Sequence, residues 1–173
     1  GYAARPDLGG GVVLTLSHPL DYLRWLLGDV GELWAFTSNQ GLGMPVEDTA
    51  EIGLRFASGC LGSLHLDYNQ RPPSHTLEIS GAQGRILWDN ANGAARLYQA
   101  DSPEDWLVAS PPSGFERNWL FMDEMYHFLA VIRGEAAPMC TLQDGIQALK
   151  LVIAAQRCAG IGFPVNQEFP SNV

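Results

Sequence analysis

The sequence has few basic residues. Its 173 residues include 10 lysines and arginines against 19 aspartates and glutamates, so the formal net charge is −9. A negative charge of this size repels phosphate backbones and anionic lipid headgroups. Nucleic acids and membrane surfaces are therefore poor candidates for a partner, and a small neutral or partly polar ligand is favoured.

Cysteines and long apolar runs are also scarce. Cys60, Cys140 and Cys158 are scattered and form no C-x-x-C pair, which favours a reducing cytoplasm over a disulfide framework or a zinc knuckle. No apolar run approaches the ~20 residues that span a bilayer, and residues 1–8 lack the apolar stretch of a signal peptide. A hydrophobic fraction of 46% still predicts a folded core. We expect one domain over residues 1–173.

Glycine motifs for binding dinucleotides or phosphates are missing as well. Gly9, Gly10 and Gly11 stand in a row, but neither G-x-G-x-x-G nor G-x-x-x-x-G-K-[ST] occurs. One interpretation is a flexible turn that uses positive φ angles. The other is that the missing side chains let a cofactor ring or a facing domain approach the backbone, which makes Gly10 and Gly11 candidate cofactor-binding positions.

The first regular element that the pattern predicts is a helix over residues 17–28. Pro19 suits the first turn and Gly28 is a natural stop. A leucine stripe recurs between them at three- and four-residue spacing: Leu20, Leu23, Leu26 and Leu27. Segments of alternating apolar and polar residues then extend from Glu32 to Gln99, and they predict an antiparallel sheet with one apolar and one polar face.

The rest of the chain is predicted to hold a loop and two helices. Residues 101–114 are rich in serine, proline and aspartate and predict a loop. Apolar stripes predict helices over residues 116–133 and 142–160, the second with Ile146, Leu149, Val152 and Ile153. Strands followed by helices predict an α+β fold, an open and mostly antiparallel sheet with helices packed on one face. Its polar face is left for a partner or a substrate.

His18 is a candidate for proton transfer. It lies in the first turn of the first helix, with Asp21 three residues on and Tyr22 four residues on. The positive end of the helix dipole disfavours the imidazolium form, whereas Asp21 favours it. One interpretation is a titration near neutral pH that suits acid–base catalysis. The other is that His18 only caps the helix or forms a local hydrogen bond.

Histidines and carboxylates elsewhere give a weaker signal. His65 and Asp67 share one strand face, and Asp123 and Glu124 precede His127 at helical spacing. A carboxylate-bridged metal site needs such a motif from two helices, so we expect no metal. A solvated polar face is favoured, and a metal-dependent hydrolase that uses His65, Asp67 and His127 is kept as an alternative.

Three long runs together resemble a known family. The opening run resembles the start of the C-terminal domain in the Gfo/Idh/MocA family of NAD(P)-dependent oxidoreductases: ARPDLGGGVVLTLSHPLDYLRWLLGDV. Two later runs are similar to the sheet and the closing helices of that domain: VEDTAEIGLRFASGCLGSLHLDYNQRPPSHTLEISGAQGRILWD and FMDEMYHFLAVIRGEAAPMCTLQDGIQALKLVIAAQRCAGIGFPV. In this family the domain follows a Rossmann domain that carries the glycine fingerprint and a Glu-Lys-Pro motif whose lysine helps catalysis. Neither motif occurs in this sequence.

The resemblance implies roles for individual residues. His18 matches the family histidine that acts with the lysine on a substrate hydroxyl or carbonyl, and Thr15 stands where the family usually has an aspartate. A threonine hydroxyl can hydrogen-bond a substrate but cannot act as a carboxylate base. Two alternatives follow: His18 works alone with the lysine of the missing domain, or the parent protein has altered or lost its activity. Other candidates for substrate contacts are chosen by position, because they flank this motif or end the polar-faced strand before the prolines: Asp21, Arg5, Tyr68, Asn69 and Arg71.

We therefore expect the substrate-binding and oligomerisation domain of an oxidoreductase that acts on a sugar, a polyol or a nucleotide sugar. NAD or NADP would bind to the parent protein, so this chain alone should be inactive. We expect a homo-dimer or tetramer formed through the sheet. The chain opens without methionine directly before the motif, which favours the downstream part of a longer protein. The alternative is a stand-alone interaction or scaffold domain that self-associates through its sheet.

Overall fold

The computed structural model describes residues 1–159. They divide into two compact units, one formed by residues 1–69 together with residues 140–159 and the other by residues 70–139. Each unit has its own antiparallel sheet, of three strands in the first and four in the second. The α+β class is confirmed, but the strands expected in one sheet are divided between two.

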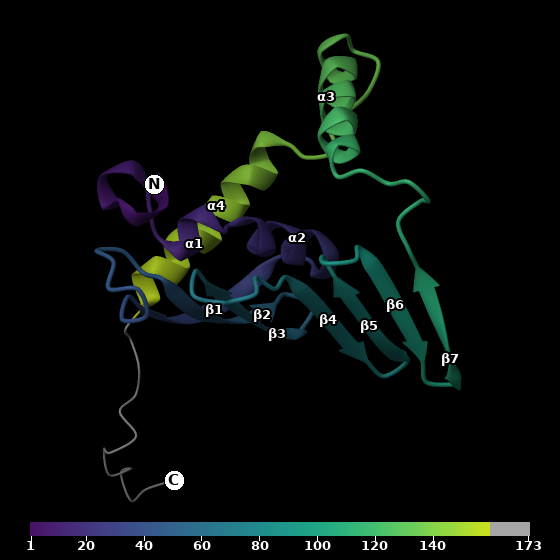
Figure 1. Ribbon diagram of the computed structural model, residues 1–173, viewed down its shortest axis with the longest axis horizontal. Helices are drawn as coiled ribbons and strands as arrows, with labels where there is room; N and C mark the ends of the chain where they lie inside the picture. Colours follow the sequence, from purple (N-terminus) through teal and green to yellow (C-terminus); the bar gives the residue numbers. More distant parts are fainter. Residues whose placement is uncertain (160–173) are drawn as a thin grey trace, which may run out of the picture. The chain divides into compact units, whose positions relative to one another are not determined.

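The first unit opens with short helical turns at Tyr2–Ala4 and Pro6–Leu8, followed by α1 (Val12–Thr15) and α2 (His18–Leu27) (Figure 1). The glycine run turns the chain between them, with φ of +73° at Gly9 and +108° at Gly11, angles that glycine adopts without steric cost. The predicted helix over residues 17–28 is confirmed to within one residue at each end.

The sheet of the first unit has the order β1-β2-β3, with β1 at Val30–Ser38, β2 at Thr49–Phe56 and β3 at Leu61–Asp67. One face is buried through six residues: Ala35, Ala50, Ile52, Leu54, Phe56 and Leu66. The long helix α4 (Leu142–Cys158) packs against β1 and α2. Val12, Val13 and Leu20 from α1 and α2 complete the core.

The buried stripe of α4 differs from the predicted one. Ala148, Val152 and Ala155 are buried, at the i, i+4, i+7 spacing of one helix face. Ile146, Leu149 and Ile153 are exposed instead, so only Val152 was placed correctly. Two of the three buried residues are alanines, and small side chains allow a helix to approach its neighbours closely. A pattern read from the largest apolar residues therefore selects a different face.

The sheet of the second unit is a meander of β4 (Thr76–Gly81), β5 (Gly84–Asp89), β6 (Ala94–Gln99) and β7 (Ser102–Ala109). The predicted loop over residues 101–114 is wrong for its first half, because β7 pairs with β6. The segment between β3 and β4 contains Pro72 and Pro73, which lack the N–H that would extend a strand ladder. The two prolines thus coincide with the break between the sheets.

The helix of the second unit, α3 (Asn118–Ile132), has no buried residue. Trp119, Leu120, Phe121 and Met122 are consecutive and all exposed. Consecutive apolar residues point to different sides of a helix, so this sequence predicts a helix without selecting the face that packs. No helix among residues 1–159 is long and apolar enough to cross a membrane.

Candidate functional site

The loop before β2 joins the start of α1 to the end of β3. The Val12 N–H donates to the carbonyl of Glu47 over 3.0 Å, and the Tyr68 N–H donates to the carbonyl of Asp48 over 2.9 Å. Two adjacent residues of one loop thus hold both segments. They bring Thr15, on α1, together with Tyr68, which follows β3.

The hydroxyls of Thr15 and Tyr68 contact each other. Thr15 Oγ1 also donates to the Gly11 carbonyl over 2.7 Å. A threonine hydroxyl has a single proton, so Tyr68 is the donor in its contact with Thr15. Burial raises the pKa of Tyr68, the negative charge of Glu47 raises it further, and the Thr15 contact opposes them. The Tyr68 phenol therefore stays protonated at neutral pH, and its proton is directed at Thr15.

The loop itself is anchored by Asp48, whose side chain is fully buried. Its carboxylate accepts the Leu42 N–H at 2.6 Å and the Thr49 hydroxyl at 2.9 Å. The Leu42 N–H is the largest cause of a lowered pKa of Asp48. The Asn69 amide donates to the Thr49 hydroxyl over 2.9 Å. Asn69, predicted as a substrate contact, is thus part of this anchor.

The two candidate cofactor glycines both face the chain's own atoms. A Cβ at Gly10 would lie 2.6 Å from the Ala3 carbonyl oxygen and 2.7 Å from the Arg5 backbone. A Cβ at Gly11 would lie 2.6 Å from the carboxyl carbon of Glu47. The missing side chains at Gly10 and Gly11 therefore let other groups approach the backbone closely. In this structure those groups are the amino-terminal turn and the Glu47 side chain.

The other predicted site residues lie in different surroundings. His18 is exposed at the start of α2, three residues after Thr15, and Asp21 is partly buried in the next turn. Arg5 pairs with Asp7, with 3.1 Å between Nε and Oδ1. Arg71 belongs to the second unit. Of the predicted residues, the structure brings Thr15 and Tyr68 into contact, with His18 on the adjoining helix.

Glu47 was missed in the sequence, although it lies in the quoted run VEDTA directly before β2. One of its carboxylate oxygens, Oε1, is buried and has no hydrogen-bond partner among the described residues. The side chain as a whole is partly exposed. No periodicity could have indicated it, because its position depends on the loop that Asp48 anchors.

The predicted pair His65 and Asp67 does lie on one strand face, where Glu51 joins it. His65 Nδ1 is 2.6 Å from Glu51 Oε1, and His65 Nε2 is 2.8 Å from Asp67 Oδ2. The Glu51 hydrogen bond is the largest cause of a raised pKa of His65, and Asp67 adds to it. In the second unit, the Met139 N–H donates to His127. Within residues 1–159, no group of three or more His, Cys, Asp or Glu side chains is placed to hold a metal ion.

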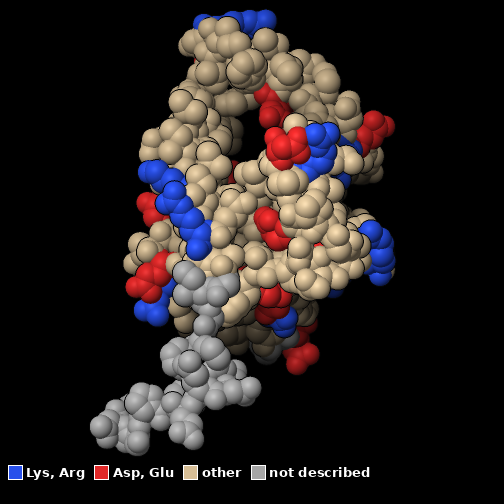
Figure 2. All heavy atoms as spheres, turned by 90° about the vertical axis from the view of Figure 1, so that its left-hand side faces the viewer, with Lys and Arg blue, Asp and Glu red and all other residues tan. Residues whose placement is uncertain are grey.

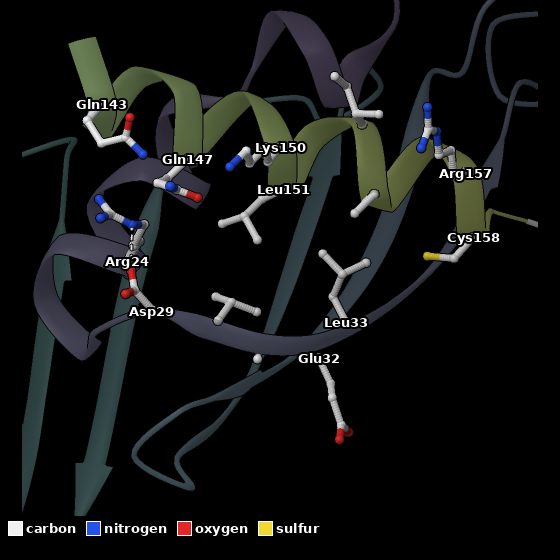
Figure 3. A pocket seen from close by; sticks show the side chains of 14 residues that line it. Arg24, Asp29, Glu32, Leu33, Gln143, Gln147, Lys150, Leu151, Arg157 and Cys158 are labelled. Atoms are coloured by element: carbon white, nitrogen blue, oxygen red, sulfur yellow. Dashed lines mark hydrogen bonds and ion pairs between the residues drawn. The ribbon is translucent and has the colours of Figure 1, made fainter. Parts of the chain in front are cut away.

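A separate pocket of about 1010 Å³ lies between the start of β1 and α4 (Figure 3). Lys150 and Arg157 line it from α4, and Glu32 and Leu33 line it from β1. None of the predicted site residues lines it. Acidic and basic side chains are also scattered among uncharged ones on the face shown in Figure 2, with no large patch of one sign.

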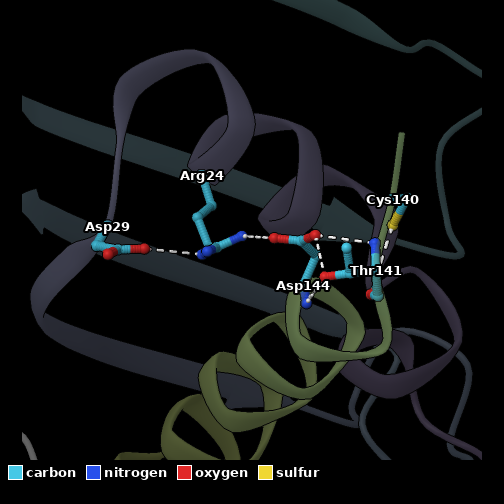
Figure 4. A network of polar contacts seen from close by, with 5 residues as sticks. All are labelled: Arg24, Asp29, Cys140, Thr141 and Asp144. Carbon is cyan, nitrogen blue, oxygen red and sulfur yellow. Dashed lines mark hydrogen bonds and ion pairs between the residues drawn. The ribbon is translucent and has the colours of Figure 1, made fainter. Parts of the chain in front are cut away.

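Two residues that line this pocket, Arg24 and Asp29, belong to a polar network (Figure 4). Arg24 of α2 pairs with Asp29 at 2.8 Å and with Asp144 of α4 at 3.0 Å. Thr141 and Asp144 form a reciprocal capping box at the start of α4. The Thr141 hydroxyl and N–H, followed by Arg24, lower the pKa of Asp144 to about 2. The network joins α2 to α4 and is part of the fold of the first unit.

A family sequence model described as "GFO/IDH/MocA C-terminal domain" matches residues 2–87. The chain is a Gfo/Idh/MocA C-terminal domain. This Gfo/Idh/MocA domain is homologous to the C-terminal halves of NAD(P)-dependent sugar dehydrogenases. The resemblance stated from the sequence is thereby confirmed.

Two curated relatives are each 28% identical to the Gfo/Idh/MocA domain. D-apiose dehydrogenase of Paraburkholderia graminis aligns with 84% of this chain and 41% of its own length. Myo-inositol 2-dehydrogenase of Thermotoga maritima aligns with 87% of this chain and 47% of its own length. The chain therefore spans less than half the length of these relatives.

A solved structure of levoglucosan dehydrogenase in complex with NADH shows the same fold. Its TM-score is 0.83 at 18% identity, and the match covers 93% of this chain and 51% of that one. A second structure of that enzyme holds NADH and L-sorbose. The α+β class and its correspondence to one half of a dehydrogenase thus agree with the sequence prediction.

Proposed function

We propose that this chain is the substrate-binding and oligomerisation domain of an NAD(P)-dependent oxidoreductase that acts on a sugar, a polyol or a nucleotide sugar. The observation that carries the proposal is the placement of His18. It is exposed on the helix that follows α1, where Thr15 contacts Tyr68. A histidine imidazole is a side chain that can bind a substrate hydroxyl and transfer its proton. The apiose and inositol dehydrogenases among the relatives support this substrate class.

This chain does not fit a dinucleotide by itself. It lacks the glycine fingerprint, and its glycine run is filled by Ala3, Arg5 and Glu47. NAD or NADP would therefore be held by another domain, and hydride transfer requires the cofactor at close range. Within this proposal, the chain binds and orients the substrate and His18 holds or moves the proton of the reacting hydroxyl. The chain alone is inactive.

The decisive test is the substitution His18→Ala in the whole protein that is encoded by the reading frame containing this chain. We expect reduction of NAD or NADP by a sugar or polyol, with kcat about 10²- to 10⁴-fold lower in the variant, as for loss of a general acid–base group. Trp25→Ala, an exposed change on the same helix, serves as the control. Full activity of His18→Ala, or turnover by residues 1–173 alone, would contradict the proposal.

A second role, self-association, is favoured by the open face of the first sheet. Trp34, Phe36 and Leu61 are exposed there, and Trp34 and Phe36 pack edge to face at a centroid distance of 5.3 Å. The Trp34 ring covers Gly53 on the neighbouring strand. An apolar centre of this kind, rimmed by charges, is typical of a protein interface. We infer that its occupant is a second copy of this chain.

Charged side chains lie at both ends of this face. Arg55 and Glu32 lie at one end, 3.4 Å apart, and Glu51, His65 and Asp67 lie at the other. A two-fold axis through the central row of Trp34 and Gly53 sets Arg55 of one copy opposite Glu51 of the other. The face also supports the alternative, a stand-alone interaction domain without enzymatic activity, which the His18 test separates from the oxidoreductase.

A further inference from the structure

The pocket between the start of β1 and α4 combines apolar walls with basic side chains, and His18 is not among the residues that line it. Its volume of about 1010 Å³ is close to the upper limit of the roughly 300–1,000 Å³ that small-molecule sites occupy. Leu33 of β1 and Leu151 of α4 extend toward the space between the two elements (Figure 3). Val30 and Ala154 also line it. These side chains form an apolar surface that suits the hydrocarbon part of a ligand.

The acidic side chains that line this pocket are already paired with arginines of the same unit. Asp29 Oδ1 lies 2.8 Å from Arg24 Nε. Glu32 Oε2 lies 3.4 Å from Arg55 Nε, and the Glu32 side chain points away from the pocket (Figure 3). An anion that enters the pocket therefore meets no unpaired carboxylate among the described residues that line it.

Two basic side chains that line the pocket have no such partner. Lys150 is the only lysine among the 173 residues, and Arg157 lies seven residues, or about two turns, further along α4. Neither forms an ion pair with any residue among 1–159, although the chain has a net charge of −9. The pocket thus combines an apolar surface with unpaired positive charge.

We propose that this pocket binds an organic anion, with its carboxylate or phosphate group on the Lys150 ammonium and its apolar part between Leu33 and Leu151. The ammonium group has three donors and forms charge-assisted hydrogen bonds with either kind of anion. The Gln147 amide lies three residues before Lys150 on the same helix face and also lines the pocket, so it can donate a further hydrogen bond. This site goes beyond the proposed function and does not rest on His18.

The test is a titration of the full chain with phenyl phosphate and with benzoate, followed by the NMR shifts of the Leu33 and Leu151 methyl groups. Lys150→Gln removes the positive charge, and Arg133→Gln, at an exposed residue of the second unit, is the matched control. We expect the dissociation constant to rise about tenfold in Lys150→Gln and to stay unchanged in Arg133→Gln. Binding of only one of the two anions supports the site and assigns it to carboxylates or to phosphate esters.

Two further probes separate the charged and apolar parts of the ligand. Benzyl alcohol lacks the negative charge and inorganic phosphate lacks the apolar part, so each should bind at least about tenfold more weakly than phenyl phosphate. Acetylation followed by mass spectrometry gives a second readout, because Lys150 carries the only side-chain amine of the chain. Phenyl phosphate should slow acetylation of Lys150 and leave that of the Gly1 α-amine unchanged.

Three results would overturn the inference. They are no binding of either anion, equal binding by Lys150→Gln and the unchanged chain, and binding of inorganic phosphate as tight as that of phenyl phosphate. Each leaves the proposed role of His18 standing, because His18 does not line this pocket. Conversely, His18→Ala should leave the binding of phenyl phosphate unchanged.

Discussion

At the scale of single residues, Asp144 at the start of α4 makes the stability of the fold depend on pH. Its pKa is lowered to about 2 from the ordinary 3.8 by Thr141 and Arg24. A lowered pKa in the folded state stabilises the fold above the ordinary pKa, and this stabilisation is lost as pH falls from about 4 to about 2. Asp144→Asn should therefore unfold more easily at pH 7 and lose less stability on acidification.

Urea unfolding at pH 7 and pH 3 measures this difference. Thr141→Ala provides a second measurement, because loss of an N-cap side chain lowers the free energy of unfolding by about 1 kcal/mol. If the free energy of unfolding depends on pH in the same way for Asp144→Asn and the unchanged chain, the loss of stability in acid does not come from Asp144.

The same scale shows where the site could be predicted. The turn signals around Pro19 and Gly28 are local, so the helix that presents His18 was predictable from neighbouring residues. The contact between Thr15 and Tyr68 spans 53 residues of sequence; the family resemblance selected Thr15 and the position at the end of a polar-faced strand selected Tyr68, but neither predicted that the two meet. Glu47 depends on the anchored loop at Asp48, a long-range arrangement that no local pattern encodes.

At the scale of elements, α4 tests how the core of the first unit is built. Val152 is fully buried, whereas Leu149 on the same helix is 47% exposed. Truncation of a buried aliphatic side chain costs its transfer free energy and leaves a cavity. We expect Val152→Ala to lower the free energy of unfolding by roughly 2 kcal/mol, and Leu149→Ala by less than about 0.5 kcal/mol.

Denaturant unfolding of the two variants gives the comparison directly. A larger loss of unfolding free energy in Leu149→Ala than in Val152→Ala would support the stripe that the sequence predicted and would place the large residues of α4 in the core.

Alternation of apolar and polar residues predicted the buried face of the strands better than the stripe predicted that of α4. Ala50, Ile52, Leu54 and Phe56 alternate along β2 and are all buried, which agrees with the predicted apolar face, because a period of two leaves only two faces to choose between. A helix offers more directions, and in α4 alanines fill the contact.

At the scale of the whole molecule, the open face of the first sheet determines the expected oligomeric state. Trp34 is 52% exposed in the centre of that face, and Trp25 is 76% exposed on α2. If two copies associate through β1, β2 and β3, a charge at Trp34 is buried in the interface, where an unpaired charge is strongly unfavourable. Trp34→Glu should be a monomer, whereas Trp25→Glu should keep the dimer although it removes the more exposed ring.

Sedimentation velocity of both variants and the unchanged chain measures the assembly state, and circular dichroism verifies that each variant is folded. The comparison is informative because the two substitutions are chemically identical and differ only in position. A dimer that survives Trp34→Glu would move the interface away from this face. A monomeric unchanged chain would remove the proposed oligomerisation role and leave the proposed role of His18 untouched, since His18 and Thr15 lie on segments outside the three strands.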